Sequence, residues 1–147
     1  MKIVYVDMDN VLVNFQSGID KLSSKQFNEF KGRYYQVPSI FSLMDPLEGA
    51  LEAFEKLSSK YDTYILSTAP WTNTTAWQDK IEWVKKYLGK LAYKKLTLSH
   101  HKNLNAGDYL IDDRLRNGAG KFKGEHIHFA TDKFPDWDTV LNYLMLD

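Results

Sequence analysis

A series of short apolar runs, separated by amphipathic segments, restricts the fold of this chain more than any other feature. Each run is a few residues long and mostly apolar, and several contain β-branched side chains, as is typical of strands buried in a parallel sheet. The sequence therefore predicts five strands, at residues 3–6, 63–66, 96–98, 109–111 and 126–129.

Helical patterns lie between several of these runs. Asp45, Pro46 and Glu48 are the residue types of an N-cap, a first turn and a capping box, so a helix is expected to begin there. A second helix is expected to follow Asn73 and to stop at Gly89. The apolar stripes are Trp77, Ile81, Val84 and Leu88 on this helix, and Val140, Leu141, Leu144 and Met145 on a third that begins near Asp136. Alternating strands and helices predict a Rossmann-like α/β three-layer sandwich with a parallel sheet.

Residues 15–45 interrupt this alternation directly after the first strand. The segment is rich in Phe and Tyr; residues 15–30 could form a helix, whereas residues 32–45 lack a regular pattern. A structureless loop of this length is uncommon in a compact domain, which favours a small inserted cap. The expected organisation is a core domain of residues 1–14 and 46–147, with residues 15–45 as the cap.

Composition excludes several classes of protein. The 147 residues are enough for one domain with a real core. Nineteen basic and nineteen acidic side chains cancel, so neither a nucleic acid polymer nor a membrane surface is an expected partner. The absence of cysteine excludes disulfides and thiolate metal sites. Because the apolar stretch at residues 3–6 is too short for a signal peptide or a membrane span, we expect a cytoplasmic protein, either monomer or homodimer.

Polar residues follow three of the predicted strands: Asp7 and Asp9, Ser67 and Thr68, and Asp112 and Asp113. Ligands of open parallel sheets bind beyond the carboxyl ends of the strands, where these side chains would meet. Two carboxylates at ~4 Å repel by about 4 kcal/mol at an effective dielectric of 20, so a cation is expected among them. Oxygen ligands without Cys or His indicate Mg²⁺. The alternative, acidic residues that cap strand ends at the surface, explains one such pair better than two.

The order of these residues resembles the four motifs of the haloacid dehalogenase superfamily of phosphatases. The motifs are Asp7-x-Asp9-x-Val11, Thr68 after a strand, Lys80 on a following helix, and Asp112-Asp113 after an apolar strand. Within that superfamily the chain is most similar to the 5'(3')-deoxyribonucleotidases. The stretches that carry this likeness are residues 41–50, 67–70, 79–89 and 110–114.

The resemblance implies a role for each motif residue, and the residue types suit these roles. Asp7 would attack phosphorus and form an aspartyl phosphate, while Asp9 would protonate the leaving group and then activate water. Lys80 would stabilise the transition state and bind phosphate. Phosphate oxygens would also contact the Thr68 hydroxyl and the backbone N–H groups near Asn10 and Ala69.

The remaining candidates concern the metal and the substrate. Asp7, Asp9, Asp112 and Asp113 are the expected Mg²⁺ ligands, with Asp112 preferred to Asp113 as the direct ligand. Lys102 is either a phosphate contact, as a basic residue near this position is in related enzymes, or a solvated lysine; His100 stands where relatives have arginine. Among several aromatic residues, Phe41 and Trp71 could stack on a nucleobase or simply pack in the cap.

Together these features predict a Mg²⁺-dependent phosphomonoesterase that acts on deoxyribonucleoside monophosphates. Residues 15–40 resemble the family least, and in that family base recognition comes largely from the cap. A sugar phosphate or another small phosphate ester is therefore an alternative substrate. A phospho-accepting signalling domain is the non-enzyme alternative. Its first strand would carry two adjacent acids, whereas Asp7 and Asp9 are separated by one residue.

Overall fold

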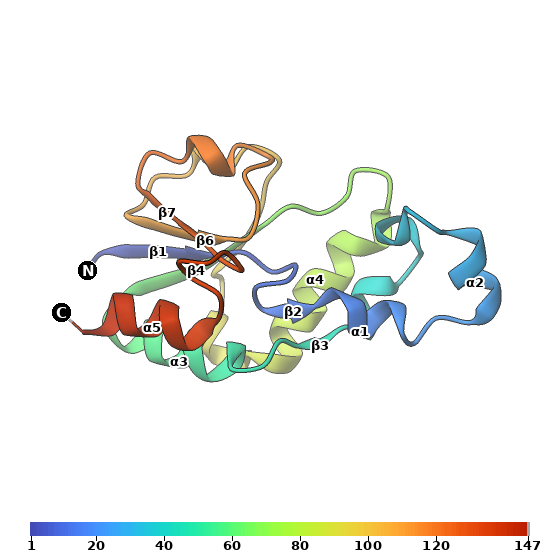
Figure 1. Cartoon of the computed structure of the whole chain (residues 1–147), viewed down its shortest axis with the longest axis horizontal. Helices are drawn as coiled ribbons and strands as arrows, with labels where there is room; N and C mark the ends of the chain where they lie inside the picture. The colour runs from blue at the N-terminus through green and yellow to red at the C-terminus, as the bar shows by residue number, and fades with distance from the viewer. Residues whose placement is uncertain (147) are drawn as a thin grey trace.

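The computed structural model describes residues 1–146 and contains a five-stranded sheet in the order β5-β4-β1-β6-β7 (Figure 1). All neighbouring strands of this sheet are parallel, which confirms the predicted α/β fold. Each strand lies within one residue of its predicted bounds. The strands are β1 (Ile3–Val6), β4 (Asp62–Ser67), β5 (Leu96–Leu98), β6 (Tyr109–Asp112) and β7 (Glu125–His128).

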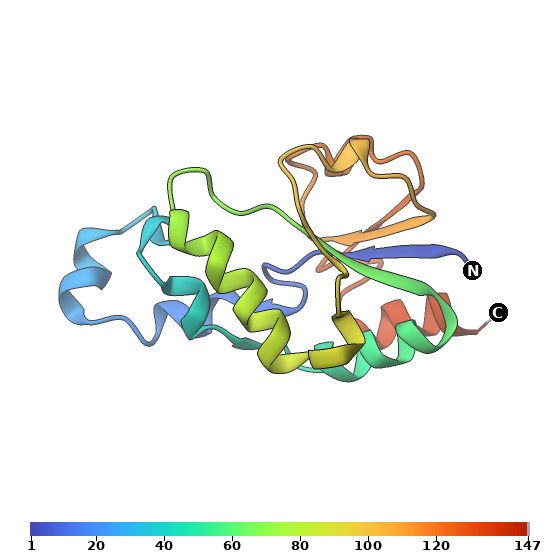
Figure 2. The ribbon, with the colours of Figure 1, turned by 180° about the vertical axis from the view of Figure 1, so that it is seen from behind.

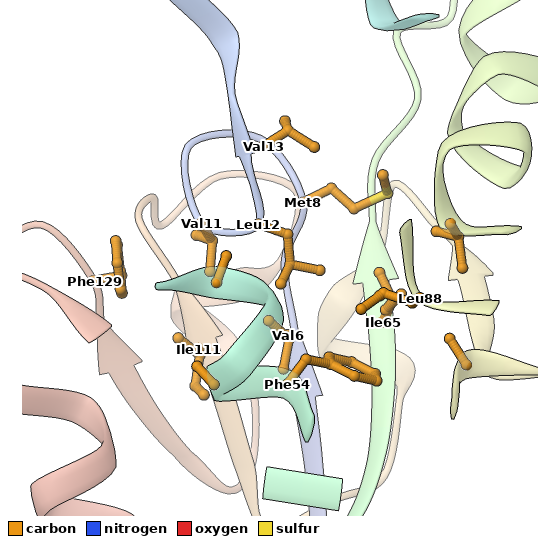
Figure 3. Packing of buried hydrophobic residues seen from close by; sticks show 14 of the residues in the cluster. Val6, Met8, Val11, Leu12, Val13, Phe54, Ile65, Leu88, Ile111 and Phe129 are labelled. Atoms are coloured by element: carbon orange, nitrogen blue, oxygen red, sulfur yellow. The ribbon is translucent and has the colours of Figure 1, made fainter. Parts of the chain in front are cut away.

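Helices α3 (Ala50–Lys60) and α5 (Trp137–Met145) pack side by side on one face of the sheet (Figures 1 and 2). Asp136 caps α5 by accepting a hydrogen bond from the Thr139 N–H at 2.9 Å, so this predicted helix start is confirmed. Figure 3 shows Phe54 of α3 meeting Val6, Ile65 and Ile111 of the sheet in the main hydrophobic core.

The opposite face of the sheet is covered by loops and short 3₁₀ helices. Two 3₁₀ helices, η4 (Lys102–Leu104) and η5 (Ala119–Lys121), lie in the connections on either side of β6. A second, smaller core joins this layer to the sheet through Leu66, Leu110, Ala119 and Phe122. These connections span residues 99–108 and 113–124, and each contains a 3₁₀ helix instead of an α-helix.

The helix predicted to begin at Asp45 begins instead at Ala50. Strand β3 (Asp45–Pro46) pairs antiparallel with β2 (Val13–Asn14), and the Leu47 N–H donates to the Leu12 carbonyl at 2.8 Å. These contacts keep the backbone extended, so the capping box does not form. Gly49 then turns the chain with a φ of 78°, a left-handed conformation that favours glycine, and directly precedes α3.

Helix α4 (Thr74–Tyr87) follows Asn73 as predicted, and the 3₁₀ helix η3 (Gly89–Ala92) comes directly after its end. The predicted buried stripe is confirmed at Val84 and Leu88, but it is wrong at Ile81, which is 42% exposed. The buried face of the helix includes residues outside that stripe. Its members are Ala76, Lys80, Trp83 and Val84.

The inserted residues 15–45 contain two short helices rather than the single helix considered for residues 15–30. The chain leaves α1 (Phe15–Ile19) at Asp20 and starts α2 (Ser24–Glu29) with Ser23 as N-cap. Two 3₁₀ helices follow, η1 (Tyr34–Gln36) and η2 (Ile40–Leu43). Figures 1 and 2 show α2 far from the sheet, whereas η2 lies against α4.

One long-range contact joins the two ends of the chain. The Trp137 indole N–H at the start of α5 donates to the Val11 carbonyl at 2.8 Å, across 126 positions. This bond fixes the loop that follows β1. Within residues 1–146, none of the helices combines the length and the apolar character needed to cross a membrane.

Candidate active site

A cleft of about 320 Å³ opens at the carboxyl ends of β1, β4 and β6. Because these strands are parallel neighbours, their ends bring residues from distant parts of the sequence to one edge of the sheet. Of the predicted site residues, the cleft is lined by Asp7, Asp9, Thr68, Trp71, His100, Lys102, Asp112 and Asp113. Tyr35, Pro70, Arg114, Arg116 and Asn117 complete the lining.

Lys102 is a buried cation at the floor of this cleft. Its ammonium nitrogen lies 2.9 Å from Asp7 Oδ1 and 2.6 Å from Asp112 Oδ2, and its side chain is 4% exposed. Burial opposes the charged form of Lys102, but the carboxylates of Asp7 and Asp112 outweigh burial and raise the Lys102 pKa. The solvated-lysine interpretation is therefore wrong, and the structure brings Lys102 to Asp7.

Three carboxylates gather beside Lys102. Oxygens of Asp7, Asp112 and Asp113 lie within 4.8 Å of one another, a donor set that suits a hard divalent cation such as Mg²⁺. Burial, followed by the charges of Asp7 and Asp112, raises the Asp113 pKa to about 7. Burial likewise raises the pKa of Asp7, partly offset by Lys102. Lys102 pairs with two of these three carboxyl groups, and a cation held by all three would favour their ionised forms.

Asp9 points to a second lysine instead of joining this cluster. Its Oδ1 lies 2.9 Å from the Lys80 ammonium nitrogen, which also donates to Ser67 Oγ at 2.9 Å. Burial raises the Asp9 pKa; Lys80 acts in the opposite direction and Asp7 in the same one. Lys80 has no exposed side-chain surface and does not line the cleft, so the structure does not place it as the predicted phosphate contact.

The predicted phosphate contacts differ in what they offer. The Asn10 N–H already donates to the Val13 carbonyl at 2.9 Å, so the expectation of a free donor there is wrong. The Ala69 N–H has no hydrogen-bond partner among residues 1–146, but Ala69 is fully buried and does not line the cleft. The Thr68 hydroxyl lines the cleft but donates to the Ser99 carbonyl at 2.7 Å, so it must rotate to donate to a ligand.

The two aromatic candidates lie in different environments. Trp71 is 78% exposed at the cleft, and its ring meets His100 edge-on with centroids 5.8 Å apart. Phe41 is buried, and its ring lies 4.5 Å from the Lys80 ammonium nitrogen. The structure therefore leaves Trp71 free to contact a ligand and keeps Phe41 away from the cleft.

Sequence reasoning missed a basic part of the cleft lining. Arg114 and Arg116 are both exposed in the loop after β6, and both line the cleft. Arg114 directly follows the predicted acidic pair Asp112 and Asp113. Because the carboxyl ends of parallel strands converge, its place in the cleft lining could have been predicted from the sequence. No sequence signal marked Asn117, whose carbonyl accepts the Lys102 N–H at 2.7 Å.

Comparison of the sequence with known proteins identifies the family of this chain. The sequence profile of the family described as "5' nucleotidase, deoxy (Pyrimidine), cytosolic type C protein" matches residues 29–135. A predicted 5'(3')-deoxyribonucleotidase of Vibrio phage KVP40 is 64% identical over 142 residues, covering 97% of this chain and 84% of the phage protein. The chain belongs to this family. It is therefore a phosphoric monoester hydrolase, as predicted.

More distant members and solved structures agree with this assignment. The cytosolic type 5'(3')-deoxyribonucleotidase of Homo sapiens is 27% identical over 158 residues, covering 86% of this chain and 79% of the human protein. The predicted HAD-hydrolase YfnB of Bacillus subtilis, solved bound to magnesium, has a TM-score of 0.67 at 11% identity, covering 97% of this chain and 98% of YfnB. A haloacid dehalogenase-like protein of Streptococcus pneumoniae, SP0104, has a TM-score of 0.58 at 16% identity. The match covers 98% of this chain and 91% of SP0104. The family's fold is thus that of the haloacid dehalogenase superfamily.

Proposed function

We propose that this phosphatase hydrolyses deoxyribonucleoside monophosphates in a Mg²⁺-dependent reaction, with an aspartyl phosphate on Asp7 as intermediate. The observation that carries the proposal is the position of Asp7, which lines the cleft, pairs with the Lys102 ammonium and clusters with the carboxylates of Asp112 and Asp113. The substrate class is supported by the names of the phage and human relatives.

Asp7, Asp112 and Asp113 are the residues that would bind Mg²⁺. When bound, the ion supplies positive charge that reduces repulsion between the carboxylates and a phosphate dianion. Magnesium in the structure of YfnB, a protein of similar fold, supports this choice of ion. We do not include Asp9 among the carboxylate ligands, because its side chain is paired with Lys80.

In the first step, a carboxylate oxygen of Asp7 forms a bond to phosphorus and the ester P–O bond breaks. The departing alkoxide takes a proton from the Asp9 carboxyl group, and burial raises the pKa of this group, in the direction that such a transfer needs. In the second step, Asp9 removes a proton from water, the water oxygen attacks phosphorus, and the bond to Asp7 breaks. Phosphate leaves and both carboxyl groups return to their starting states.

The rest of the cleft suits the substrate's other groups. Lys102 offsets the charge of Asp7, while a rotated Thr68 hydroxyl would donate to a phosphate oxygen. The exposed Trp71 ring would stack on the base. We also propose residues 15–45 as a cap on the core, since Tyr35 of this segment reaches the cleft.

A phosphate-release panel tests the proposal. Deoxyribonucleoside and ribonucleoside monophosphates, with the phosphate at the 5' or 3' position, and sugar phosphates are each assayed with Mg²⁺ and with EDTA. We expect Mg²⁺-dependent release with preference for the deoxyribonucleotides, and loss of that release in Asp7→Asn but not in a control, Asp132→Asn, at an exposed carboxyl. Turnover of sugar phosphates alone would refute the nucleotide assignment, and turnover retained in Asp7→Asn would refute the intermediate.

A further inference from the structure

The inserted segment contacts the candidate catalytic residues behind the cleft floor. Phe41 of η2 is 3% exposed, and its ring lies 4.5 Å from the Lys80 ammonium nitrogen. Phe15 of α1 supports that ring edge-on, with centroids 5.9 Å apart. Two aromatic residues of the insertion therefore form one wall around a buried lysine of α4.

Lys80 has three kinds of neighbour and no contact with solvent. Its ammonium donates to Asp9 Oδ1 and Ser67 Oγ, both at 2.9 Å. An ammonium group has three N–H donors, and two of them are used by these bonds, while the Phe41 ring centroid lies 4.5 Å from the nitrogen. A cation over an aromatic face is attracted by the ring quadrupole, and more strongly when water is excluded. The ring therefore contributes to the stability of the charged lysine in this site.

The segment that carries Phe41 is fixed to the same helix that carries Lys80. The Asn73 amide, at the start of α4, donates to the carbonyls of Tyr35 at 2.9 Å and Val37 at 3.0 Å. The Trp83 indole N–H donates to the Met44 carbonyl at 2.9 Å. These bonds lie on both sides of Phe41 in the sequence, and Figure 2 shows this part of the insertion running alongside α4. The distance between the ring and Lys80 is thus set by a fixed framework.

We propose that Phe41 and Ser67 are positioning residues that direct the Lys80 ammonium onto Asp9, so that the inserted segment forms part of the acid–base site. This inference rests on the proposed function, in which Asp9 transfers the proton. The Lys80 side chain has four rotatable bonds, and the ring and the hydroxyl contact its ammonium on the sides that do not face Asp9. Asp9 in turn keeps 32% of its side chain exposed and lines the cleft.

Kinetics of matched Phe→Leu variants test the positioning role. Phe41→Leu keeps an apolar side chain but removes the ring, and we expect kcat to fall about tenfold, equivalent to about 1.4 kcal/mol, with KM unchanged. Phe41→Tyr retains the ring and should restore most of kcat. The control is Phe30→Leu, which removes a cation–π contact of similar length, 4.6 Å to Arg33, elsewhere in the insertion. Equal losses in both Leu variants, or no loss in Phe41→Leu, would overturn the inference.

A crystal structure of Phe41→Leu gives a second readout that needs no turnover. The distance between Lys80 Nζ and Asp9 Oδ1 should lengthen beyond hydrogen-bonding range, whereas an unchanged distance would refute the role of the ring. If Phe41→Leu fails to fold, Ser67→Ala removes the other contact and is measured in the same two ways. Wild-type protein without phosphate release would refute the proposed function alone, because the crystallographic distance still tests the positioning.

Discussion

Replacement of Asp113 by Asn should stabilise the metal-free protein. The surroundings of Asp113 raise its pKa from 3.8 to about 7, so the folded state disfavours the charge that the unfolded chain carries. A shift of about three units corresponds to about 4 kcal/mol. Because the Asp113 side chain keeps 13% exposure and interacts with the neighbouring Asp7 carboxyl, we discount this to about 2 kcal/mol. Asparagine carries no charge and avoids this penalty.

The sign of the effect depends on pH in a defined way. With a folded-state pKa above the unfolded value, Asp113 contributes no penalty below pH 3.8, and the penalty grows until pH passes about 7. Asp113→Asn should therefore raise the melting temperature at pH 8 by about 4–8 °C and leave it unchanged near pH 4. Thermal denaturation in EDTA measures both, with Asp132→Asn as the exposed control.

Addition of Mg²⁺ should make the wild-type protein more stable than Asp113→Asn. A ligand at 100 times its Kd stabilises the folded state by about 2.7 kcal/mol, and wild type should approach this gain. Asp113→Asn has lost one of the three clustered carboxylates and should gain less. Equal melting temperatures of variant and wild type in EDTA at pH 8 would refute the account of the cluster's charge.

Three further substitutions test other parts of the site. Lys102→Met leaves two buried carboxylates without their cation, so urea denaturation in EDTA should show a loss of about 3–5 kcal/mol, and kcat should fall at least about 100-fold. Trp71→Ala should raise KM for nucleotides about tenfold and leave both KM for sugar phosphates and the melting temperature unchanged, because the exposed ring would contact only the base. In Gly118→Ala, the new methyl group would collide with the Asn103 side chain at a φ of 79°, so thermal denaturation should show a loss of about 2 kcal/mol or more.

The sheet could be predicted from the sequence because each strand is a short apolar run between polar turns. The convergence of Asp7, Thr68 and Asp112 followed from the rule for the carboxyl ends of parallel strands. The prediction of the strands depends on local composition, and the prediction of the site depends on a general property of parallel sheets. Neither requires knowledge of side-chain contacts.

The two lysines could not be assigned in the same way. Lys80 counts as polar in any hydrophobic pattern, yet it is fully buried, so the predicted stripe of α4 included the exposed Ile81 in place of Lys80. Lys102 lies in a polar stretch with no periodicity, and its burial depends on Asp7, directly after β1, and on Asp112 at the end of β6. Contacts across 95 and 10 positions of sequence are tertiary and leave no local signal. The start of α3 was mispredicted for a related reason, because pairing with Val13–Asn14 keeps Asp45–Pro46 extended.

The bond between Trp137 and Val11 has a consequence for synthesis of the protein in the cell. A ribosome makes the loop after β1 before it makes α5, and 126 positions separate Val11 from Trp137, so the loop is synthesised well before its anchor. Asp9, two positions before Val11, therefore lacks this support during that part of translation. A nonsense mutation between Asn117 and Trp137 would remove the anchor, although every cleft residue would still be encoded.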